Sequence, residues 1–345
     1  MPDSLWLTRY GPEGASSRYR AFQLADGLSA HGWTLRFDPL AEWRGSAPSQ
    51  VAGVARRIRR LRTIGGAAAV LVVQKEPLMP PSLRRLVTGS LRSADVPIVW
   101  DIDDAVWLGR RGAEAMAIDM CTIADHVVAG NRLLGEWAER HGAPEVTVVP
   151  TCFDPAGAPP ASTAAASVDG PRVVWVGSPA TAPLVEPFAA VLRNALDSLP
   201  GLSIEFVGGP PPAALRGHDR VVATSWSPES EREALAAADF GLALQDRGEY
   251  ADHKCGFKIV QYLAYGIVPI ASDGPVHRDI VGDHGLLVGT PADSDAVVDR
   301  LATPPTSDEQ SAIVEHHRRG YSVQRAVDGW SGVLAAVDRG RGSTA

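Results

Sequence analysis

Short apolar runs rich in β-branched residues alternate along the first half of the chain with longer amphipathic stretches. The run AAAVLVVQ is apolar without alternation, as expected for a strand that is covered on both faces of a parallel sheet. Strands are predicted at residues 4–10, 34–40, 67–74, 96–102, 126–131 and 146–150. Helices are predicted at residues 18–31, in the arginine-rich stretch to about residue 62, at 82–91 and 114–121, and through residue 137. Alternation of this kind predicts βαβ units in a parallel sheet.

The same alternation restarts in the second half of the chain. Strands are predicted at residues 172–177, 203–209, 221–226, 240–245, 268–272 and 285–289. Helices are predicted up to about residue 199 and at 229–238, 256–265, 294–301 and 323–337. Gly266, directly after one of these helices, suits the left-handed residue that commonly ends a helix. The whole pattern predicts an α/β fold with two doubly wound parallel sheets.

A change of composition marks the expected boundary between the two domains. The segment PAGAPPASTAAASVDG, residues 155–170, is rich in Pro, Ala, Ser and Gly and has almost no charge, which is typical of a linker. The predicted organisation is a first Rossmann-like domain at 1–154, a second at 171–318, and a C-terminal helix and tail at 319–345 that packs back on the first domain. Ligands of doubly wound sheets bind beyond the carboxyl ends of the strands, so a cleft between the domains is the expected site.

Overall composition excludes several classes of protein. The 345 residues suffice for two domains, and the net charge of −7 without a basic stripe argues against a nucleic-acid partner. The N-terminus lacks a secretory signal, and the most apolar stretch, residues 67–73, is too short to span a bilayer. Three cysteines lack metal-ligand spacing. These features predict a cytoplasmic protein without integral membrane contact, while the oligomeric state stays open.

Lysine is rare, which draws attention to each lysine. Of 33 basic residues only three are lysines, at positions 75, 254 and 258. Lys254 and Lys258 lie near the expected start of the helix at 256–265, where unpaired backbone N–H groups and the helix dipole favour an anion. Both ammonium groups could therefore meet a diphosphate, and Gln261 one turn later could contact a ribose hydroxyl. The alternative is a surface helix with two solvated lysines.

Three aspartates cluster in VWDIDDAVW, where Asp101, Asp103 and Asp104 follow a predicted strand. Carboxylates this close repel one another, and some of their pKa values are expected to rise. One interpretation is an Asp-x-Asp metal site. The others are helix capping or a sugar contact for Asp104 and an acceptor-side carboxylate for Asp103.

Polar residues in two further loops are also expected at the carboxyl ends of strands. Arg18 and Arg20 follow GPEGASS at the predicted start of a helix, where they can hold a phosphate or an anionic acceptor, or lie solvated in its first turn. Lys75 ends the third strand, where it can contact a substrate or form a surface pair with Glu76. Neither a GxGxxG nor a GxxxxGK[ST] pattern follows a strand, so dehydrogenase and P-loop ATPase activities lose support.

The histidines show no paired metal-ligand spacing. Of these, His316 and His317 are expected on the exposed face of a helix.

The segment FKIVQYLAYGIVPIAS is similar to the nucleotide-binding segment of glycosyltransferase family 4, whose members have the GT-B fold. Four further segments resemble the family in the family's order along the chain. They are GASSRYRAFQLADGL, VVAGNRLLGEWAERHGAPEVTVVPTCFD, WVGSPATAP and WSPESEREALAAADFGLALQD. The resemblance therefore extends over most of the sequence.

The resemblance implies a retaining, metal-independent glycosyltransferase with two Rossmann-like domains that face a cleft, and no cofactor. The donor would be a nucleotide-sugar, with a UDP-sugar such as UDP-GlcNAc favoured. The acceptor would be a small molecule or carrier-bound, as in natural-product or cell-envelope glycoside biosynthesis. The implied catalytic residues are Lys258, Lys254, Asp103 and Asp104. The implied donor-binding residues are Gly14, Gly177, Ser178, His253, Gly256, Phe257 and Gln261, and the acceptor-side residues are Arg18, Arg20 and Lys75.

The chain also departs from the family pattern. Where many members have two glutamates, this sequence has His253 and Gln261. WVGSPATAP lacks the Arg and Lys that often hold the diphosphate, and its Ser178 and Thr181 offer only hydroxyl and backbone contacts. Two alternatives therefore remain beside transfer: a nucleotide-sugar binder that has lost activity, and a nucleotide-sugar epimerase on the same fold.

Overall fold

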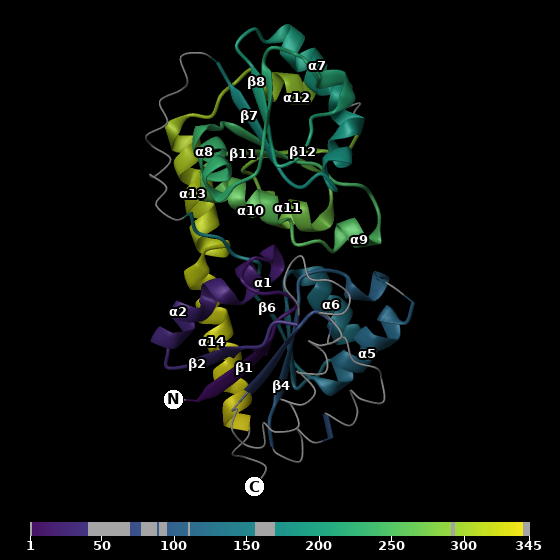
Figure 1. The fold of residues 1–345 in the computed structure, drawn as a ribbon, viewed down its shortest axis with the longest axis vertical. Helices are drawn as coiled ribbons and strands as arrows, with labels where there is room; N and C mark the ends of the chain where they lie inside the picture. The colour runs from purple at the N-terminus through teal and green to yellow at the C-terminus, as the bar shows by residue number, and fades with distance from the viewer. Residues whose placement is uncertain are drawn as a thin grey trace. The chain divides into compact units, whose positions relative to one another are not determined.

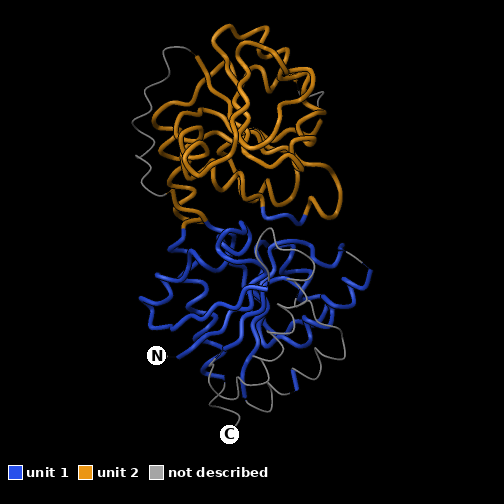
Figure 2. The backbone as a smooth tube through the Cα atoms, viewed as in Figure 1, with its two compact units in different colours: residues 1–152, 253–255, 323–345 blue, residues 153–252, 256–322 orange. Residues whose placement is uncertain are grey.

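The computed structural model describes residues 2–40, 70–76, 88–89, 95–109, 111–155, 170–290 and 294–340. The chain forms two compact units, coloured separately in Figure 2. Unit 1 contains residues 1–152, 253–255 and 323–345, and unit 2 contains residues 153–252 and 256–322. The tripeptide 253–255 therefore belongs to the unit formed by the N-terminal half of the chain.

Unit 1 is built on a six-stranded sheet with the order β2-β1-β3-β4-β5-β6, in which every pairing is parallel. Its strands are β1 (Asp3–Leu7), β2 (Thr34–Phe37), β3 (Val70–Gln74), β4 (Ile98–Ile102), β5 (His126–Ala129) and β6 (Val146–Val148). Successive strand residues enter different hydrophobic clusters: Leu5 and Leu7 belong to one, Trp6 to the other. Because strand side chains alternate between the faces of a sheet, the sheet is buried on both sides.

The described helices of unit 1 are α1 (Ala15–Arg20), α2 (Ala25–Ala30), α5 (Ala113–Ile123), α6 (Arg132–Arg140) and α14 (Val323–Gly340). Short 3-10 turns lie at Phe22–Leu24 and Val106–Leu108. The C-terminal helix α14, yellow in Figure 1, packs against α2 and β3. Its Trp330 ring lies 4.6 Å from the Trp6 ring, centroid to centroid. The last helix thus completes the core of the unit that contains the N-terminus.

The first helix begins earlier than the sequence pattern predicts. α1 starts at Ala15 after the N-cap residue Gly14, and its backbone breaks at Ala21, where φ is −135°. Arg18 and Arg20 consequently lie in its last turn. The expectation that they occupy a first turn is wrong, because the loop closes at Gly14.

Unit 2 has a second six-stranded parallel sheet with the order β12-β11-β10-β7-β8-β9. Its strands are β7 (Arg172–Val176), β8 (Ser203–Val207), β9 (Val221–Thr224), β10 (Phe240–Ala243), β11 (Val268–Ser272) and β12 (Leu286–Val288). Its helices are α7 (Ala189–Ser198), α8 (Pro228–Ala237), α9 (Glu249–Asp252), α10 (Phe257–Ala264), α11 (Pro275–Val281), α12 (Ser294–Leu301) and α13 (Ser307–Gly320). Two further 3-10 segments lie at Ala182–Phe188 and Ala213–Leu215.

The sequence pattern predicted the strands better than the helices. Each strand of the two sheets coincides with one of the predicted apolar runs, and the α/β class with two doubly wound sheets is confirmed. The helices predicted to about residue 62 and at 82–91 lie wholly or mostly outside the described residues. No helix in the described part of the chain is long and apolar enough to cross a membrane.

Candidate functional site

The carboxyl edge of the unit 1 sheet carries a lysine in an unusual backbone conformation. Lys75 follows β3 with a φ of 55°, in the left-handed region that non-glycine residues seldom adopt. Two hydrogen bonds hold it there: its N–H donates to the Asp101 carbonyl at 2.7 Å, and its carbonyl accepts from the Trp100 indole at 2.7 Å. Strain of this kind persists where the surroundings fix it, often at functional sites.

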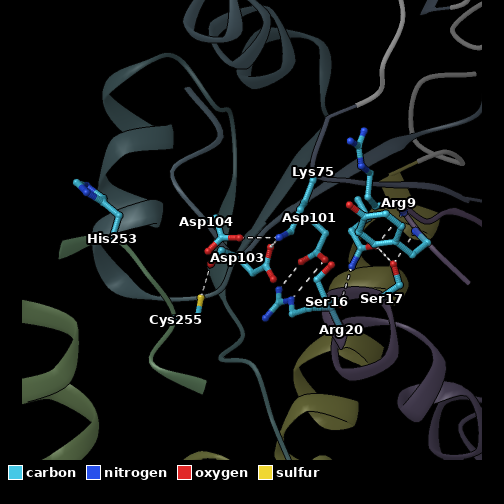
Figure 3. A network of polar contacts seen from close by, with 12 residues as sticks. Arg9, Ser16, Ser17, Arg20, Lys75, Asp101, Asp103, Asp104, His253 and Cys255 are labelled. Atoms are coloured by element: carbon cyan, nitrogen blue, oxygen red, sulfur yellow. Dashed lines mark hydrogen bonds and ion pairs between the residues drawn. The ribbon is translucent and has the colours of Figure 1, made fainter. Parts of the chain in front are cut away.

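The Lys75 ammonium lies between two of the three aspartates, as Figure 3 shows. Its Nζ is 2.9 Å from Asp103 Oδ1 and 2.6 Å from Asp104 Oδ2, and its side chain is 17% exposed. Burial alone would lower the pKa of Lys75, but the charges of Asp103 and Asp104 outweigh that effect and raise it. Lys75 is therefore a fixed cation that orients both carboxylates.

The pKa of Asp104 is raised although its carboxylate forms an ion pair with Lys75. Burial, and next the charge of Asp103, raise the pKa of Asp104 above its ordinary value, while Lys75 and Lys254 act to lower it. Asp104 is also the most exposed of the three aspartates, at 24%, against 11% for Asp103 and 2% for Asp101.

Arg20 is buried against the third aspartate. Its guanidinium forms an ion pair with the Asp101 carboxylate, and its Nη1 donates to the Val149 carbonyl at 2.5 Å. The Arg20 side chain is only 1% exposed. The expected acceptor-side role does not fit this burial, because the charge of Arg20 is already used inside unit 1.

The loop before α1 is held by a side chain of that helix. Arg18 donates to the backbone carbonyls of Pro12 and Glu13 at 3.0 and 3.1 Å. A Cβ at Gly14 would lie 2.5 Å from Tyr10 Cβ, so only glycine fits this position. Arg18 and Gly14 therefore shape the loop, and their predicted substrate contacts stay predictions.

The tripeptide 253–255 is attached to the same edge of unit 1. The side-chain amide of Asn131, the N-cap residue of α6, donates to the His253 carbonyl at 2.7 Å. The Cys255 thiol donates to the Asp103 carbonyl at 2.7 Å, also drawn in Figure 3. Burial, with the charge of Asp103, raises the pKa of Cys255, so the thiol stays protonated and can donate. The Trp107 ring meets the His253 ring edge-on, with centroids 5.1 Å apart.

This attachment separates the two lysines that were expected on one helix. Gly256 has a left-handed φ of 56°, and a Cβ there would lie 2.6 Å from the Ile280 side chain. α10 consequently begins at Phe257. Lys254 precedes the helix and belongs to unit 1, whereas Lys258 lies in the first turn of α10 in unit 2. The expectation that both lysines share one helix face is wrong.

The carboxyl edge of the unit 2 sheet is made of closely packed glycine loops. Gly177 follows β7, and a Cβ there would lie 2.5 Å from the Trp175 ring. Gly208 follows β8 with a φ of 87°, and a Cβ there would lie 2.3 Å from the Gly177 carbonyl oxygen. After Gly177, the exposed Ser178 is held by Thr181, whose hydroxyl donates to the Ser178 carbonyl at 3.1 Å. Such loops expose backbone groups to a ligand without side chains in the way.

Lys258 lies over an aromatic ring at this edge. Its Nζ is 4.4 Å from the centroid of the Trp175 ring, a cation–π distance. Among the described residues, the buried indole N–H of Trp175 has no hydrogen-bond acceptor, and the Lys258 contact with the face of the ring does not supply one. Phe257, the first residue of α10, packs edge-on against Phe153 with centroids 6.0 Å apart. The ammonium is thereby positioned in the first turn of α10, where the helix dipole favours an anion.

Gln261 is bound to a glutamate that the sequence analysis did not single out. Gln261 as a residue is 3% exposed, and its side-chain amide donates to Glu231 Oε1 at 2.8 Å. Glu231 lies in the first turn of α8 and also accepts the Trp226 indole N–H through Oε2. Thirty positions separate Glu231 from Gln261 along the chain, so only the fold brings them together.

The described residues contain no group of three or more His, Cys, Asp or Glu side chains placed to hold a metal ion.

The expectation that His316 and His317, at the end of α13, lie on the exposed face of a helix is wrong. His317 is 2% exposed and contacts the Phe153 carbonyl at 2.7 Å, and His316 contacts the Ile280 carbonyl at 2.8 Å.

No protein-family model matches the sequence, and no curated protein matches it. Solved structures do match over nearly the full length of the chain. Sucrose-phosphate synthase from Thermosynechococcus elongatus has a TM-score of 0.64 at 14% identity and covers 99% of this chain and 100% of its own. The lipopolysaccharide outer core galactosyltransferase WaaB in its apo form has a TM-score of 0.65 at 14% identity and covers 97% and 99%.

A third similar structure is the UDP-forming α,α-trehalose-phosphate synthase from Burkholderia vietnamiensis. It has a TM-score of 0.61 at 14% identity and covers 99% of both chains. All three similarities support one conclusion about architecture: this chain has the GT-B fold of two Rossmann-like domains.

Proposed function

We propose that this chain is a glycosyltransferase that moves a sugar from a nucleoside diphosphate sugar to an acceptor hydroxyl. The observation that carries the proposal is the position of Lys258 at the carboxyl edge of the unit 2 sheet. It lies in the first turn of α10, over the Trp175 ring, in the unit whose edge also has the Gly177 and Gly208 loops. A cation and a helix N-terminus together suit the two negative charges of a diphosphate.

The chemistry follows from where charge develops. When the bond between the anomeric carbon and the phosphate oxygen breaks, negative charge grows on the departing diphosphate. A fixed ammonium aimed at that charge stabilises the transition state more than the ground state. Lys258 is the described cation best placed in unit 2 to do so, while the predicted contribution of Lys254 stays a prediction.

The donor is proposed to be a UDP-sugar. Two similar structures support this choice by what is said of them. The trehalose-phosphate synthase is UDP-forming. The pneumococcal O-GlcNAc transferase GtfA, with a TM-score of 0.57 at 12% identity over 83% of this chain and 60% of its own, was solved with UDP and GlcNAc. Retention of anomeric configuration, membership of family 4 and independence from metal rest on the sequence resemblance alone. We include these three properties in the proposal on the basis of that resemblance.

The acceptor is proposed to bind at the carboxyl edge of the unit 1 sheet. Asp103 and Asp104 are oriented there by Lys75, and their remaining oxygen lone pairs can accept hydrogen bonds from acceptor hydroxyls. A small-molecule or carrier-bound acceptor rich in hydroxyl or amino groups fits this site, because these groups can donate hydrogen bonds to the carboxylates.

Hydrolysis of the nucleotide-sugar tests the proposal without knowledge of the acceptor, because water can slowly take the place of the acceptor hydroxyl. The purified chain is incubated with UDP-, GDP-, ADP- and dTDP-sugars in EDTA, and release of free nucleotide and the sugar product are followed by NMR. Release of one nucleotide, lost in Lys258→Ala, supports transfer, and the first-formed anomer reports retention. Binding of a donor without release would indicate a nucleotide-sugar binder, and a changed sugar still attached to its nucleotide would indicate an epimerase.

A further inference from the structure

We propose that the Arg9 guanidinium in unit 1 binds an anionic group of the acceptor, and that the acceptor is therefore a sugar or polyol that carries a phosphate or a carboxylate. This inference rests on the proposed function, because it names the chemical class of the acceptor. It assigns a ligand contact to an arginine that the sequence analysis did not single out. Arg9 follows β1, at the same edge of the sheet as Lys75 and the aspartates.

Other basic side chains at this edge already have partners within unit 1. Lys75 is held between two carboxylates, and Arg20 forms an ion pair with Asp101. Arg18 donates to two backbone carbonyls of the loop before α1. The sequence analysis expected Arg18 and Arg20 to hold a phosphate or an anionic acceptor. These contacts instead compensate the charge of Arg20 and hold Arg18 against its own loop.

The Arg9 guanidinium lacks a partner of this kind. Its Nη1 is buried and has no hydrogen-bond partner among the described residues. The ring of the neighbouring Tyr10 lies 5.6 Å from Cζ, which is a cation–π distance but supplies no hydrogen-bond acceptor. Removing a charged donor from water without a partner costs free energy, and a bound anion offsets that cost. Arg9 as a residue is only partly buried, so a ligand can approach its side chain from solvent.

The backbone of Arg9 is fixed by a buried amide. Gln74, the last residue of β3, is 2% exposed, and its Oε1 accepts the Arg9 N–H at 3.1 Å. The same oxygen accepts the Ser17 hydroxyl at 2.7 Å, while Nε2 donates to the Ser16 carbonyl at 3.0 Å. The base of the Arg9 side chain is therefore held in place before a ligand binds. Such preorganisation lowers the entropy cost of binding.

Strand order sets the distance between Arg9 and the aspartates. β1, β3 and β4 are consecutive in the sheet, and Figure 3 shows Lys75 between Arg9 and Asp104. Neighbouring strands lie about 4.8 Å apart, so the ends of β1 and β4 are about 10 Å apart. An anionic group is repelled by Asp103 and Asp104 and attracted by Arg9. An acceptor about the size of one sugar can thus place its anionic group on Arg9 and a hydroxyl on the aspartates.

The chemistry of guanidinium explains why the group is a phosphate or a carboxylate. The planar fork of arginine offers parallel N–H donors that match two oxygens of either group. A neutral hydroxyl matches neither the charge nor the pair of donors. The acceptor should therefore lose most of its affinity when its anionic group is removed.

The test compares compounds that differ only in the group at one carbon. Glucose, glucose 6-phosphate and glucuronate form one such series, and the corresponding mannose and galactose compounds form two more. Dissociation constants are measured by calorimetry on the full chain, with and without UDP. The proteins are wild type, Arg9→Met, Arg9→Lys and the control Arg140→Met, which removes an exposed arginine from the last turn of α6.

At least one anionic compound is expected to bind wild type and Arg140→Met about 10-fold to 100-fold more tightly than its neutral parent, as for hydrogen bonds to a charged group. In Arg9→Met this preference should fall to about threefold or less, through weaker binding of the anionic compound alone. Arg9→Lys keeps the charge without the fork and should retain part of the preference. Preference for the 6-phosphate identifies a phosphate, and preference for the uronate identifies a carboxylate.

Two results would overturn the inference while leaving the proposed function intact. The first is a wild type that binds no anionic compound more tightly than its neutral parent. The second is an Arg9→Met variant with the wild-type preference. The proposed function fails separately, if no nucleotide-sugar releases its nucleotide on wild type.

Discussion

Among the described residues, arginine and aspartate side chains are buried in unit 1 but not in unit 2. In unit 1 the described buried polar residues include the charged side chains Arg20, Asp38, Asp101 and Asp103. In the described part of unit 2 they are Gln261, His277, Gln310 and His317. The carboxyl edge of unit 1 is therefore a frame of ion pairs, whereas unit 2 has buried amides and imidazoles behind an edge that presents Lys258 over a ring.

This difference predicts which property of the protein a substitution in each unit will change. Buried ion pairs cost much to break, because the partner that remains is an uncompensated charge. Changes in the unit 1 frame should therefore lower stability first. Changes at the unit 2 edge leave no charge buried, so they should act mainly on ligand affinity.

Arg20→Met should give the largest loss of stability, and it tests the ion pairs of unit 1 directly. It leaves the Asp101 carboxylate buried without its guanidinium partner, which should lower the free energy of unfolding by about 3–5 kcal/mol. Urea denaturation followed by circular dichroism measures this loss. The double variant Arg20→Met/Asp101→Leu should recover most of it. A single variant within 1 kcal/mol of wild type would break the comparison between the units.

His317 tests unit 2 by pH, because its imidazole is buried in the neutral form. Burial, opposed by its contact with the Phe153 carbonyl, lowers its pKa to about 4, against about 6.5 in an unfolded chain. Between these values the unfolded state binds a proton that the folded state does not. Stability should therefore fall as the pH drops from 7 to 4, by on the order of 3 kcal/mol from this group.

His317→Gln is the control for that pH dependence. Its amide can still donate to the Phe153 carbonyl but does not titrate in this range. Denaturation curves at pH 7, 5.5 and 4 should show a smaller loss in the variant than in wild type. Equal losses in the two proteins would mean that His317 is not neutral in the folded chain.

Lys75→Met should lower the free energy of unfolding by about 2 kcal/mol at pH 7. This is less than for Arg20→Met, because the Lys75 side chain keeps some contact with solvent. The variant leaves Asp103 and Asp104 facing each other. The pKa of Asp104, already raised by burial and by Asp103, should rise further, so the folded state would take up a proton before the unfolded state does. Acidification to pH 5 should therefore reduce the deficit, and a deficit that grows on acidification would contradict this account.

Trp175→Phe should have the smallest effect on ligand affinity, although it also removes volume at a residue that is 0% exposed and so lowers the stability of unit 2. A cation–π contact contributes about 0.5–1 kcal/mol at an accessible site, and tryptophan is the strongest of the rings. The dissociation constant of the bound nucleotide should rise about threefold. A double-mutant cycle with Lys258→Met, followed by urea denaturation without ligand, isolates the contact, because the loss of ring volume is common to both backgrounds and only the cation–π part depends on the ammonium.

The elements of this fold were predictable wherever one local signal decided them. The continuous apolar runs of β3 and β4 predict buried parallel strands, and their register places Gln74 beside Asp101. Lys75, Asp103 and Asp104 follow the ends of these neighbouring strands, so their proximity follows from topology.

The contacts that no local signal decides were missed. The left-handed Gly256 places Lys254 outside α10, although the spacing of the two lysines suits a helix. The Asn131 contact with His253 and the Glu231 contact with Gln261 each join distant segments, and depend on how helices pack on the sheets. The polar appearance of α13 predicts exposure for His317, but its packing buries it.

Thermal stabilisation by nucleotides tests the central claim, that the unit 2 edge binds a nucleoside diphosphate through Lys258. Melting of wild type, Lys258→Ala and the control Arg193→Ala, whose arginine pairs with Asp197 on α7, is followed with UDP, GDP, ADP and dTDP, with and without EDTA. A nucleotide at 100 times its dissociation constant adds about 2.7 kcal/mol of stability. We predict that one nucleotide stabilises wild type and the control equally in EDTA but fails to stabilise Lys258→Ala. Stabilisation that persists in Lys258→Ala, or that is absent with every nucleotide, would contradict the account.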